Sequence, residues 1–266
     1  EAGNNKLGYR NINITTSADN TDNIIIGYDA YDETIINGSV VGYANKNTDD
    51  AIATVTTENG TSEYTKAYGY MWVEDVEQLQ AINTNLSGNY ALRNSIDATA
   101  TSSWNNNEGF KQIGTEINNA FTGKFDGIDY NIFGLTIKTG GENTGLFGYT
   151  NNATISNVTL VGGSITGKDN VGAIVGSANN TTLTNVVNSA AVSGDSNVGG
   201  IVGSADNSVI KDAINTGVIN GSGDNVGGLI GNLQDSKFVE ATDDTEEVEK
   251  GLIGNSYNLG DVSGNG

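Results

Sequence analysis

The stretch that decides the fold occurs twice in succession. Residues 168–194 read KDNVGAIVGSANNTTLTNVVNSAAVSG, and residues 195–221 read DSNVGGIVGSADNSVIKDAINTGVING. A unit of this size usually cannot bury its own apolar face, so repetition on this scale indicates that each unit stacks on a neighbouring copy. The sequence therefore predicts a repeat architecture with a continuous core.

The repeat extends to both sides of these two units. A related unit begins at Glu142 and another at Asp224, and equivalent asparagines recur once in each unit. Glycine and asparagine tolerate left-handed corners that other residues resist. We predict that the recurring residues hold the corners of the repeat: Gly148, Gly176, Gly203, Gly231, Asn143, Asn170, Asn197 and Asn225.

Within each unit the apolar residues follow the pattern of short strands. Runs around Ile174, Val186 and Val192 are separated by Gly, Asn, Ser and Asp, which is typical of strands joined by turns. Three strands in a unit of this length make one coil of a parallel β-helix, whose rungs pair with the rungs above and below. We predict an all-β fold, a β-helix (β-solenoid) with a period of about 27–28 residues per coil in the C-terminal half.

An acidic segment interrupts the fourth unit. NSYNLGDVSG, from Asn255, matches DAINTGVING, from Asp212. We predict an insertion of about 15 residues between the two halves of this unit, with its acidic part at about 238–250, because insertions in repeat proteins map to loops on one face.

Upstream of the repeats the pattern is less regular. Residues 120–138 are expected to form a hairpin or two rung strands. Val76, Leu79 and Ile82 follow acidic residues at a spacing of three, which predicts one short helix near 74–83.

Three regions follow from these patterns. Residues 1–70 are expected to form irregular β-rungs or a small β-domain, and the sequence leaves this choice open. Residues 71–140 form the opening region of the β-helix with the short helix, and residues 141–266 form the repeat coils with the acidic insertion.

Composition and charge exclude several functions. The net charge is −20 with only 12 basic residues, so we expect no nucleic-acid binding, because a duplex is recognised first through its phosphates. No apolar run is long enough for a membrane helix, so we expect no membrane insertion. The absence of an initiating Met and of a signal peptide suggests a fragment of a larger protein.

The sequence contains few candidate catalytic residues. The chain has no His and no Cys, which removes the usual serine and cysteine nucleophile arrangements. Asp126 and Asp129 form the nearest carboxylate pair, but Asp beside Gly is common in turns. We therefore expect no catalytic residue, and we predict that the chain is not an enzyme.

Metal and ligand sites are equally sparse. The run from Glu240 to Glu249 offers oxygen ligands that suit calcium, but it lacks the glycine spacing of a calcium loop. We expect no cofactor, with calcium as the one ion that the composition would suit. Asp169, Asp195 and Asp224 are expected to cap turns.

Tyrosines of the N-terminal region provide the candidate ligand surface. Aromatic rings stack on sugars, and the residues assigned to this surface are Tyr28, Tyr31 and Tyr43. The competing interpretation is that these rings cover strand ends and core edges.

A family resemblance adds to this interpretation. DNVGAIVGS, SNVGGIVGS and DNVGGLIGN, from residues 169, 196 and 224, resemble the GLUG-type repeat of bacterial surface proteins. The segment MWVEDVEQLQAIN, the Trp-Asn turn at SSWNNNEG and the FDG step are similar to the stretch that introduces such repeats in filamentous-haemagglutinin-like adhesins. The resemblance runs from about Tyr70 to the end.

This resemblance implies a right-handed parallel β-helix from the shaft of a large exoprotein, exported by two-partner secretion. It also implies a secreted or outer-membrane-associated cell-surface location and a role in attachment, aggregation or biofilm formation. Expected partners are an outer-membrane transporter and surface glycans or proteins, or exopolysaccharide. The alternatives are a polysaccharide-processing β-helix enzyme and the filament of a contact-dependent toxin-delivery protein.

Overall fold

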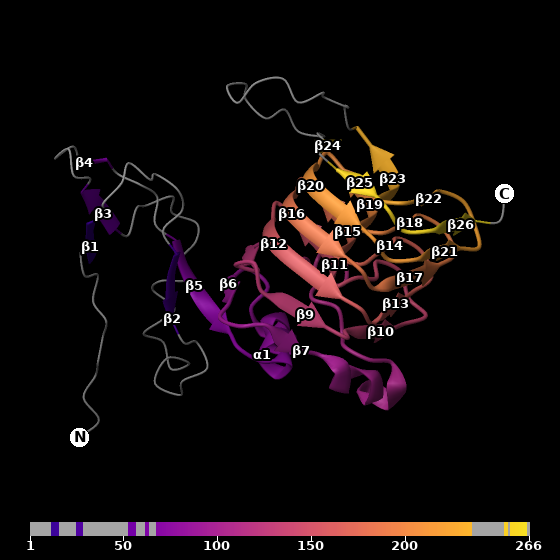
Figure 1. The fold of residues 1–266 in the computed structure, drawn as a ribbon, viewed down its shortest axis with the longest axis horizontal. Helices are drawn as coiled ribbons and strands as arrows, with labels where there is room; N and C mark the ends of the chain where they lie inside the picture. Colours follow the sequence, from indigo (N-terminus) through magenta and orange to yellow (C-terminus); the bar gives the residue numbers. More distant parts are fainter. Residues whose placement is uncertain are drawn as a thin grey trace. The chain divides into compact units, whose positions relative to one another are not determined.

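The computed structural model describes residues 68–235, 253–254 and 256–264, and four short strands nearer the N-terminus. Contacts between residues divide the chain into two compact units, residues 1–72 with 88–91 and residues 73–87 with 92–266. Figure 1 shows the repeats of the second unit as strands stacked side by side. The domain boundaries proposed from the sequence stay predictions.

The described parts of the first unit are strands. β1 (Ile12–Thr15) pairs in parallel with β3 (Ala53–Thr56), and β4 (Ser62–Glu63) pairs with β3 in the antiparallel direction. β2 (Ile25–Tyr28) pairs in parallel with β5 (Tyr68–Val73). The strand β6 (Asn89–Leu92) follows β5 in the order of the same sheet.

The predicted short helix is confirmed. Helix α1 (Val76–Ala81) continues as a 3-10 turn, η3 (Ile82–Thr84). The Asp75 carboxylate caps its N-terminus by accepting a hydrogen bond of 2.7 Å from the Gln78 N–H, as N-terminal caps do. Val76, Leu79 and Ile82 are buried, so the three-residue spacing marks the face that packs within the second unit.

The opening region of the second unit is made of rungs. Its strands β8 (Lys124–Asp126) and β9 (Asn131–Phe133) both pair in parallel with β12 (Thr154–Val161). β10 (Thr136–Lys138) pairs in parallel with β13 (Ser164–Thr166). The hairpin interpretation of residues 120–138 is therefore wrong, because a hairpin would pair its own strands in the antiparallel direction.

Parallel sheets run along the repeats, with one strand from each coil. Their orders are β10-β13-β17-β21-β26, β11-β15-β19-β23, β14-β18-β22 and, within the second unit, β8-β12-β16-β20-β24 with β7, β9 and β25 beside it. The remaining bounds are β7 Ile96–Asp97, β11 Phe147–Asn151, β14 Val171–Gly172, β15 Val175–Asn179, β16 Thr182–Asn188, β17 Ala191–Gly194, β18 Val198–Gly199, β19 Val202–Asp206, β20 Val209–Asn215, β21 Ile219–Gly221, β22 Val226–Gly227, β23 Ile230–Gln234, β24 Ile253–Gly254, β25 Tyr257–Asn258 and β26 Val262–Gly264.

The register between coils follows the sequence repeat. Leu183 pairs with Ile155 on one side and with Ile210 on the other, and each partner lies one repeat away in the sequence. Ile214 pairs with Tyr257, and this longer offset agrees with the alignment of DAINTGVING with NSYNLGDVSG. Most of the predicted acidic insertion lies outside the described residues. The all-β, right-handed parallel β-helix predicted from the sequence is confirmed.

Aliphatic side chains fill the interior of the coils. Val175, Leu183, Val186 and Val192 are fully buried, as are most of the residues that pair with them in the adjacent coils. Near the first coil the core is aromatic, with the ring centroids of Phe121 and Phe147 4.8 Å apart. Each apolar side chain therefore stacks on a counterpart one coil away, which gives the continuous core that a repeat fold requires.

Close backbone contact explains the recurring glycines. A Cβ added to Gly203 would lie 2.3 Å from the carbonyl carbon of Asn170 and 2.4 Å from the backbone nitrogen of Val171. Gly148, Gly176 and Gly231 show the same crowding against backbone atoms. None of these four glycines has a positive φ. Their role differs from the predicted left-handed corner: they let the corner of one coil approach the next strand.

A row of buried asparagines runs through the same coils. Asn188 and Asn215 are fully buried. The Asn188 Nδ2 donates to the Asn215 Oδ1 at 2.8 Å, and the Asn215 Nδ2 donates to the Asn258 Oδ1 at 2.7 Å.

Each of these amides also binds its own chain two residues further on. The Asn215 Nδ2 donates to the Gly217 carbonyl at 3.0 Å, and the Asn215 Oδ1 accepts from the Gly217 N–H at 3.2 Å. Because both ends of the amide are occupied, the row satisfies the hydrogen bonds that burial demands.

We expect Gly203→Ala to destabilise the β-helix, because the new methyl group meets backbone atoms that have no room to move. Overpacking of this kind costs about 1–3 kcal/mol. Gly140→Ala is the matched control, since an added Cβ there has no atom within 4 Å. The measurement is the urea midpoint of unfolding by circular dichroism. Equal midpoints for the two variants would contradict the close contact.

We expect Asn215→Ala to lower the free energy of unfolding, because it leaves the Gly217 N–H and one N–H of the neighbouring Asn188 amide without a partner inside the protein. An unsatisfied buried group costs about 1–3 kcal/mol. The exposed Asn220→Ala is the control. A urea titration in which both variants unfold at the wild-type midpoint would show that the buried row contributes nothing.

Candidate functional site

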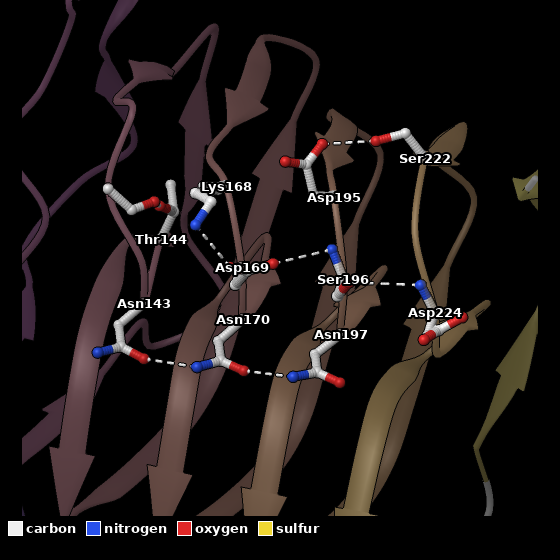
Figure 2. A network of polar contacts seen from close by, with 11 residues as sticks. Asn143, Thr144, Lys168, Asp169, Asn170, Asp195, Ser196, Asn197, Ser222 and Asp224 are labelled. Carbon is white, nitrogen blue, oxygen red and sulfur yellow. Dashed lines mark hydrogen bonds and ion pairs between the residues drawn. The ribbon is translucent and has the colours of Figure 1, made fainter.

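Three of the predicted asparagines form a hydrogen-bonded ladder along one corner of the coils, and the fourth extends it. The Asn170 Nδ2 donates to the Asn143 Oδ1 at 3.0 Å, and the Asn197 Nδ2 donates to the Asn170 Oδ1 at 2.8 Å (Figure 2). Asn225 donates to Asn197 at 2.8 Å. All four residues have positive φ angles between 54° and 60°, so asparagine meets both the backbone and the side-chain requirement of this corner.

A polar edge lies beside this ladder (Figure 2). The Asp169 Oδ1 accepts from the Ser196 N–H at 3.2 Å, and the Ser196 Oγ accepts from the Asp224 N–H at 3.3 Å. Lys168 lies 3.4 Å from the Asp169 carboxylate, and Ser222 donates to the Asp195 carboxylate. The carboxylates of Asp169 and Asp195 therefore bind groups of the following coil, while Asp224 takes part through its backbone N–H, and these bonds join successive coils.

Two other predicted residues have a structural environment. The Asp126 Oδ1 accepts from the Ile128 N–H at 2.9 Å and from the Asn157 Nδ2 at 2.9 Å. Asp129 occupies a left-handed turn position with φ of 60°. Both carboxylates thus belong to the tight turn between β8 and β9.

The three tyrosines of the predicted ligand surface have no described side chains, so this surface stays a prediction. Tyr28 is the last residue of strand β2, and Tyr31 and Tyr43 lie outside the described residues.

The side chains of the described residues do not fit a catalytic metal. Catalytic zinc sites use three protein ligands, with His in most of them, and the chain has no His and no Cys. No group of three or more Asp or Glu residues close enough to hold a metal ion occurs in the described part of the chain.

A shallow hollow of about 520 Å³ lies in the opening region of the second unit, and none of the site residues predicted from the sequence lines it. It is lined by Gln80, Asn83, Trp104, Asn105, Lys111, Gln112 and Thr115. The only signal in the sequence was Trp104 followed by three asparagines. Most of the other lining residues follow Trp104 closely in the chain, whereas Gln80 comes from helix α1 and Asn83 from η3.

The segment that carries Trp104 has an unusual backbone. Asn105, Asn106 and Asn107 have φ angles of 50°, 57° and 69°, in the left-handed region that costs non-glycine residues about 1–2 kcal/mol each and asparagine less. The Asn105 Nδ2 donates to the Gly109 carbonyl at 2.7 Å, and the Gly109 N–H donates to the Trp104 carbonyl at 3.0 Å. These bonds close the loop directly behind Trp104.

The 3-10 turn η4 (Thr99–Ser103) leads into this loop and is anchored by Asp97. The Thr99 hydroxyl and the Thr99 N–H donate to the Asp97 Oδ1 at 2.7 and 3.0 Å. These two hydrogen bonds hold the pKa of Asp97 below its ordinary value, because they favour the charged carboxylate. The anchor therefore stays ionised at neutral pH.

Amide side chains fix the opposite wall of the hollow. Gln80 donates through Nε2 to the Lys111 carbonyl at 2.8 Å and accepts through Oε1 from the Lys111 N–H at 2.9 Å. The Asn83 Oδ1 accepts from the Gly114 N–H at 3.1 Å. Both amides are thus held by the backbone of residues 111–114.

In the regions that the structure describes, no helix has the length and apolar character needed to cross a membrane.

Comparison with known proteins gives one family, one relative and one solved structure. Residues 61–194, half of the chain, match the model of the M26 IgA1-specific metallo-endopeptidase N-terminal region. Halomucin from Haloquadratum walsbyi is 37% identical over 145 residues, which are 52% of this chain and 2% of halomucin. The chain therefore spans a very small part of that relative.

The structural likeness supports the fold alone. The crystal structure of a proposed immunoglobulin A1 protease from Bacteroides ovatus matches with a TM-score of 0.52 and 16% identity, over 73% of this chain and 67% of that chain.

The prediction that the chain is not an enzyme is wrong at the level of the family, because the matching model is the N-terminal region of a peptidase. The assignment to filamentous-haemagglutinin-like adhesins with GLUG-type repeats stays a resemblance. The chain belongs to the family of the M26 IgA1-specific metallo-endopeptidase N-terminal region.

Proposed function

We propose that this chain is a partner-binding β-solenoid segment of a large secreted or cell-surface protein of the M26 family. Its role is to hold a glycoprotein or a surface partner along a stiff array of coils. The observation that carries the proposal is the strict register of the coils, which repeats the same polar side chains at every coil of the Asn143–Asn225 corner.

Regular spacing gives such an array a mechanical and a binding advantage. Neighbouring strands lie about 4.8 Å apart, so the polar edge and the outward side chains of each sheet recur at that interval. Many weak contacts on one extended surface gain through effective concentration, and the total affinity exceeds that of a single contact by a large factor. The net charge of −20 keeps such rods from associating edge to edge.

The family suggests how binding would serve a peptidase. Its description names immunoglobulin A1 as the specific substrate, and a solenoid that engages such a glycoprotein would raise its concentration near a metal centre. The side chains described here do not fit that metal, so its ligands would come from other residues of the protein.

A second candidate function is adhesion, which the resemblance to filamentous-haemagglutinin-like proteins favours. In that case the same array would support attachment, aggregation or biofilm formation by binding surface glycans, proteins or exopolysaccharide. The similarity to halomucin supports a location outside the cell for either candidate.

The test is capture by beads that carry the 266-residue chain at several surface densities. Immunoglobulin A1 and a mucin-type glycoprotein are offered in solution, and the amount retained is measured. We expect retention that rises steeply with density, with an apparent affinity at least about tenfold above that of the soluble chain, because avidity gains of about 10²–10⁴ are typical.

Beads that carry the heat-unfolded chain are the control for nonspecific retention. Retention of neither glycoprotein above that control, at any density, would contradict a partner-binding role. Retention of the mucin alone would favour adhesion over engagement of a peptidase substrate.

A further inference from the structure

We propose that the hollow beside Trp104 binds a carboxylate-bearing sugar of a glycan. This inference rests on the proposed function and deepens it, because it names the chemical class that the partner presents. All residues of the hollow belong to the second unit.

Trp104 provides the platform for the sugar ring. Its side chain is partly exposed and lines the hollow. The face of an indole ring is electron-rich, so it attracts the polarised C–H groups of a pyranose ring. Sites of this kind combine an aromatic surface with a few polar groups that fix the orientation of the ligand.

The loop behind Trp104 is held in one conformation. Three consecutive left-handed asparagines and Gly109, with φ of 89°, form it. A Cβ added to Gly109 would lie 2.2 Å from the Thr136 carbonyl oxygen, so the loop is fitted closely against the next rung. Strained backbone that is fixed by its surroundings clusters at binding sites, and a fixed ring loses little entropy when a ligand stacks on it.

Polar groups face the platform with hydrogen-bonding capacity to spare. Gln80 and Asn83 are held in place by the backbone of residues 111–114, yet each amide oxygen retains a second lone pair. Gln112 also lines the hollow, and its side-chain amide forms no hydrogen bond with another described residue. These groups match the ring of hydroxyls that a sugar presents around its stacked face.

Lys111 selects the charge of the ligand. Its side chain is exposed at the hollow, and no carboxylate of the described residues forms an ion pair with its ammonium group. Its ammonium group can pair with the carboxylate of a ligand, and this local attraction acts against the repulsion from a chain with a net charge of −20. Nucleic acid is the poorer candidate, because its phosphates need several cations together.

Intrinsic fluorescence gives the direct binding measurement. The chain has two tryptophans, so Trp72→Phe leaves Trp104 as the reporter. The probes are 3′-sialyllactose, trigalacturonate and lactose, which separate an animal-glycoprotein acid, a polysaccharide acid and a neutral sugar. We expect at least one acidic sugar to change the Trp104 emission at a lower concentration than lactose does.

Variants then assign the binding to the hollow. Isothermal titration should show that Trp104→Ala weakens the acidic sugar at least about tenfold, which is about 1.4 kcal/mol, while Trp104→Phe retains most of the affinity. Lys111→Gln should remove the preference for the acidic sugar over lactose. Tyr257→Ala is the matched control, since Tyr257 is an aromatic residue 51% exposed in another coil, and it should bind like wild type.

Equal affinities of Trp104→Ala and Tyr257→Ala for the acidic sugar, or equal affinities of the wild-type chain for acidic and neutral sugars, would overturn this site. Bead capture separates this failure from that of the proposed function. Beads with Trp104→Ala that still retain glycoprotein at the wild-type level would exclude the hollow and leave the proposed function standing, whereas beads with no retention by the wild-type chain would overturn both.

Discussion

The structure depends on main-chain hydrogen bonds between parallel strands one coil apart. These bonds fix an offset of one sequence repeat, and the offset decides which side chains meet. It places Leu183 between Ile155 and Ile210 in the core and stacks asparagine on asparagine at the corner. A slip of one residue would turn every buried side chain outward. The pattern of apolar residues in the repeat therefore fixes the register between coils.

The corner ladder and the glycines are consequences of this register. Asparagine at positive φ turns the chain and offers an amide that reaches the same amide in the next coil. The strand that follows then passes so close to the preceding corner that only glycine fits at Gly176 and Gly203. The recurring glycines and asparagines could both be predicted because their period is visible in the sequence. The prediction placed both residue types at the left-handed corner, whereas only the asparagines adopt the left-handed conformation there.

Other features of the structure could not be predicted from the sequence, because they depend on which residues the coils bring together. The row of Asn188, Asn215 and Asn258 could not be predicted from the sequence, because a polar residue is expected on the surface. Only the coil geometry shows that each amide binds its own backbone and the asparagine of an adjacent coil. The hollow at Trp104 joins residues that are distant in the sequence. The prediction that the chain is not an enzyme was wrong for another reason. It was based on the catalytic side chains that this segment lacks, whereas the family model is named after the peptidase in which such segments occur.

The regular coils and the irregular opening region of the β-helix use their polar side chains differently. The coils from β11 onwards use their polar side chains on one another, through the ladders and the polar edge of Figure 2, and this makes them stiff. In the opening region the partly exposed Trp104 and the exposed Lys111 line one hollow. Repeated coils next to a hollow support the proposed binding of a glycoprotein.

Engineered disulfides test the central claim, that neighbouring coils pair in the stated register. Ser156 and Thr184 are paired residues of β12 and β16, and parallel partners about 4.8 Å apart lie within the Cα range of about 4.4–6.8 Å that a disulfide spans. The chain has no cysteine of its own. Under mild oxidation Ser156→Cys with Thr184→Cys should cross-link within one chain, and Ser156→Cys with Thr182→Cys, two residues out of register, should not. Cross-linking of the second pair in preference to the first would contradict the account.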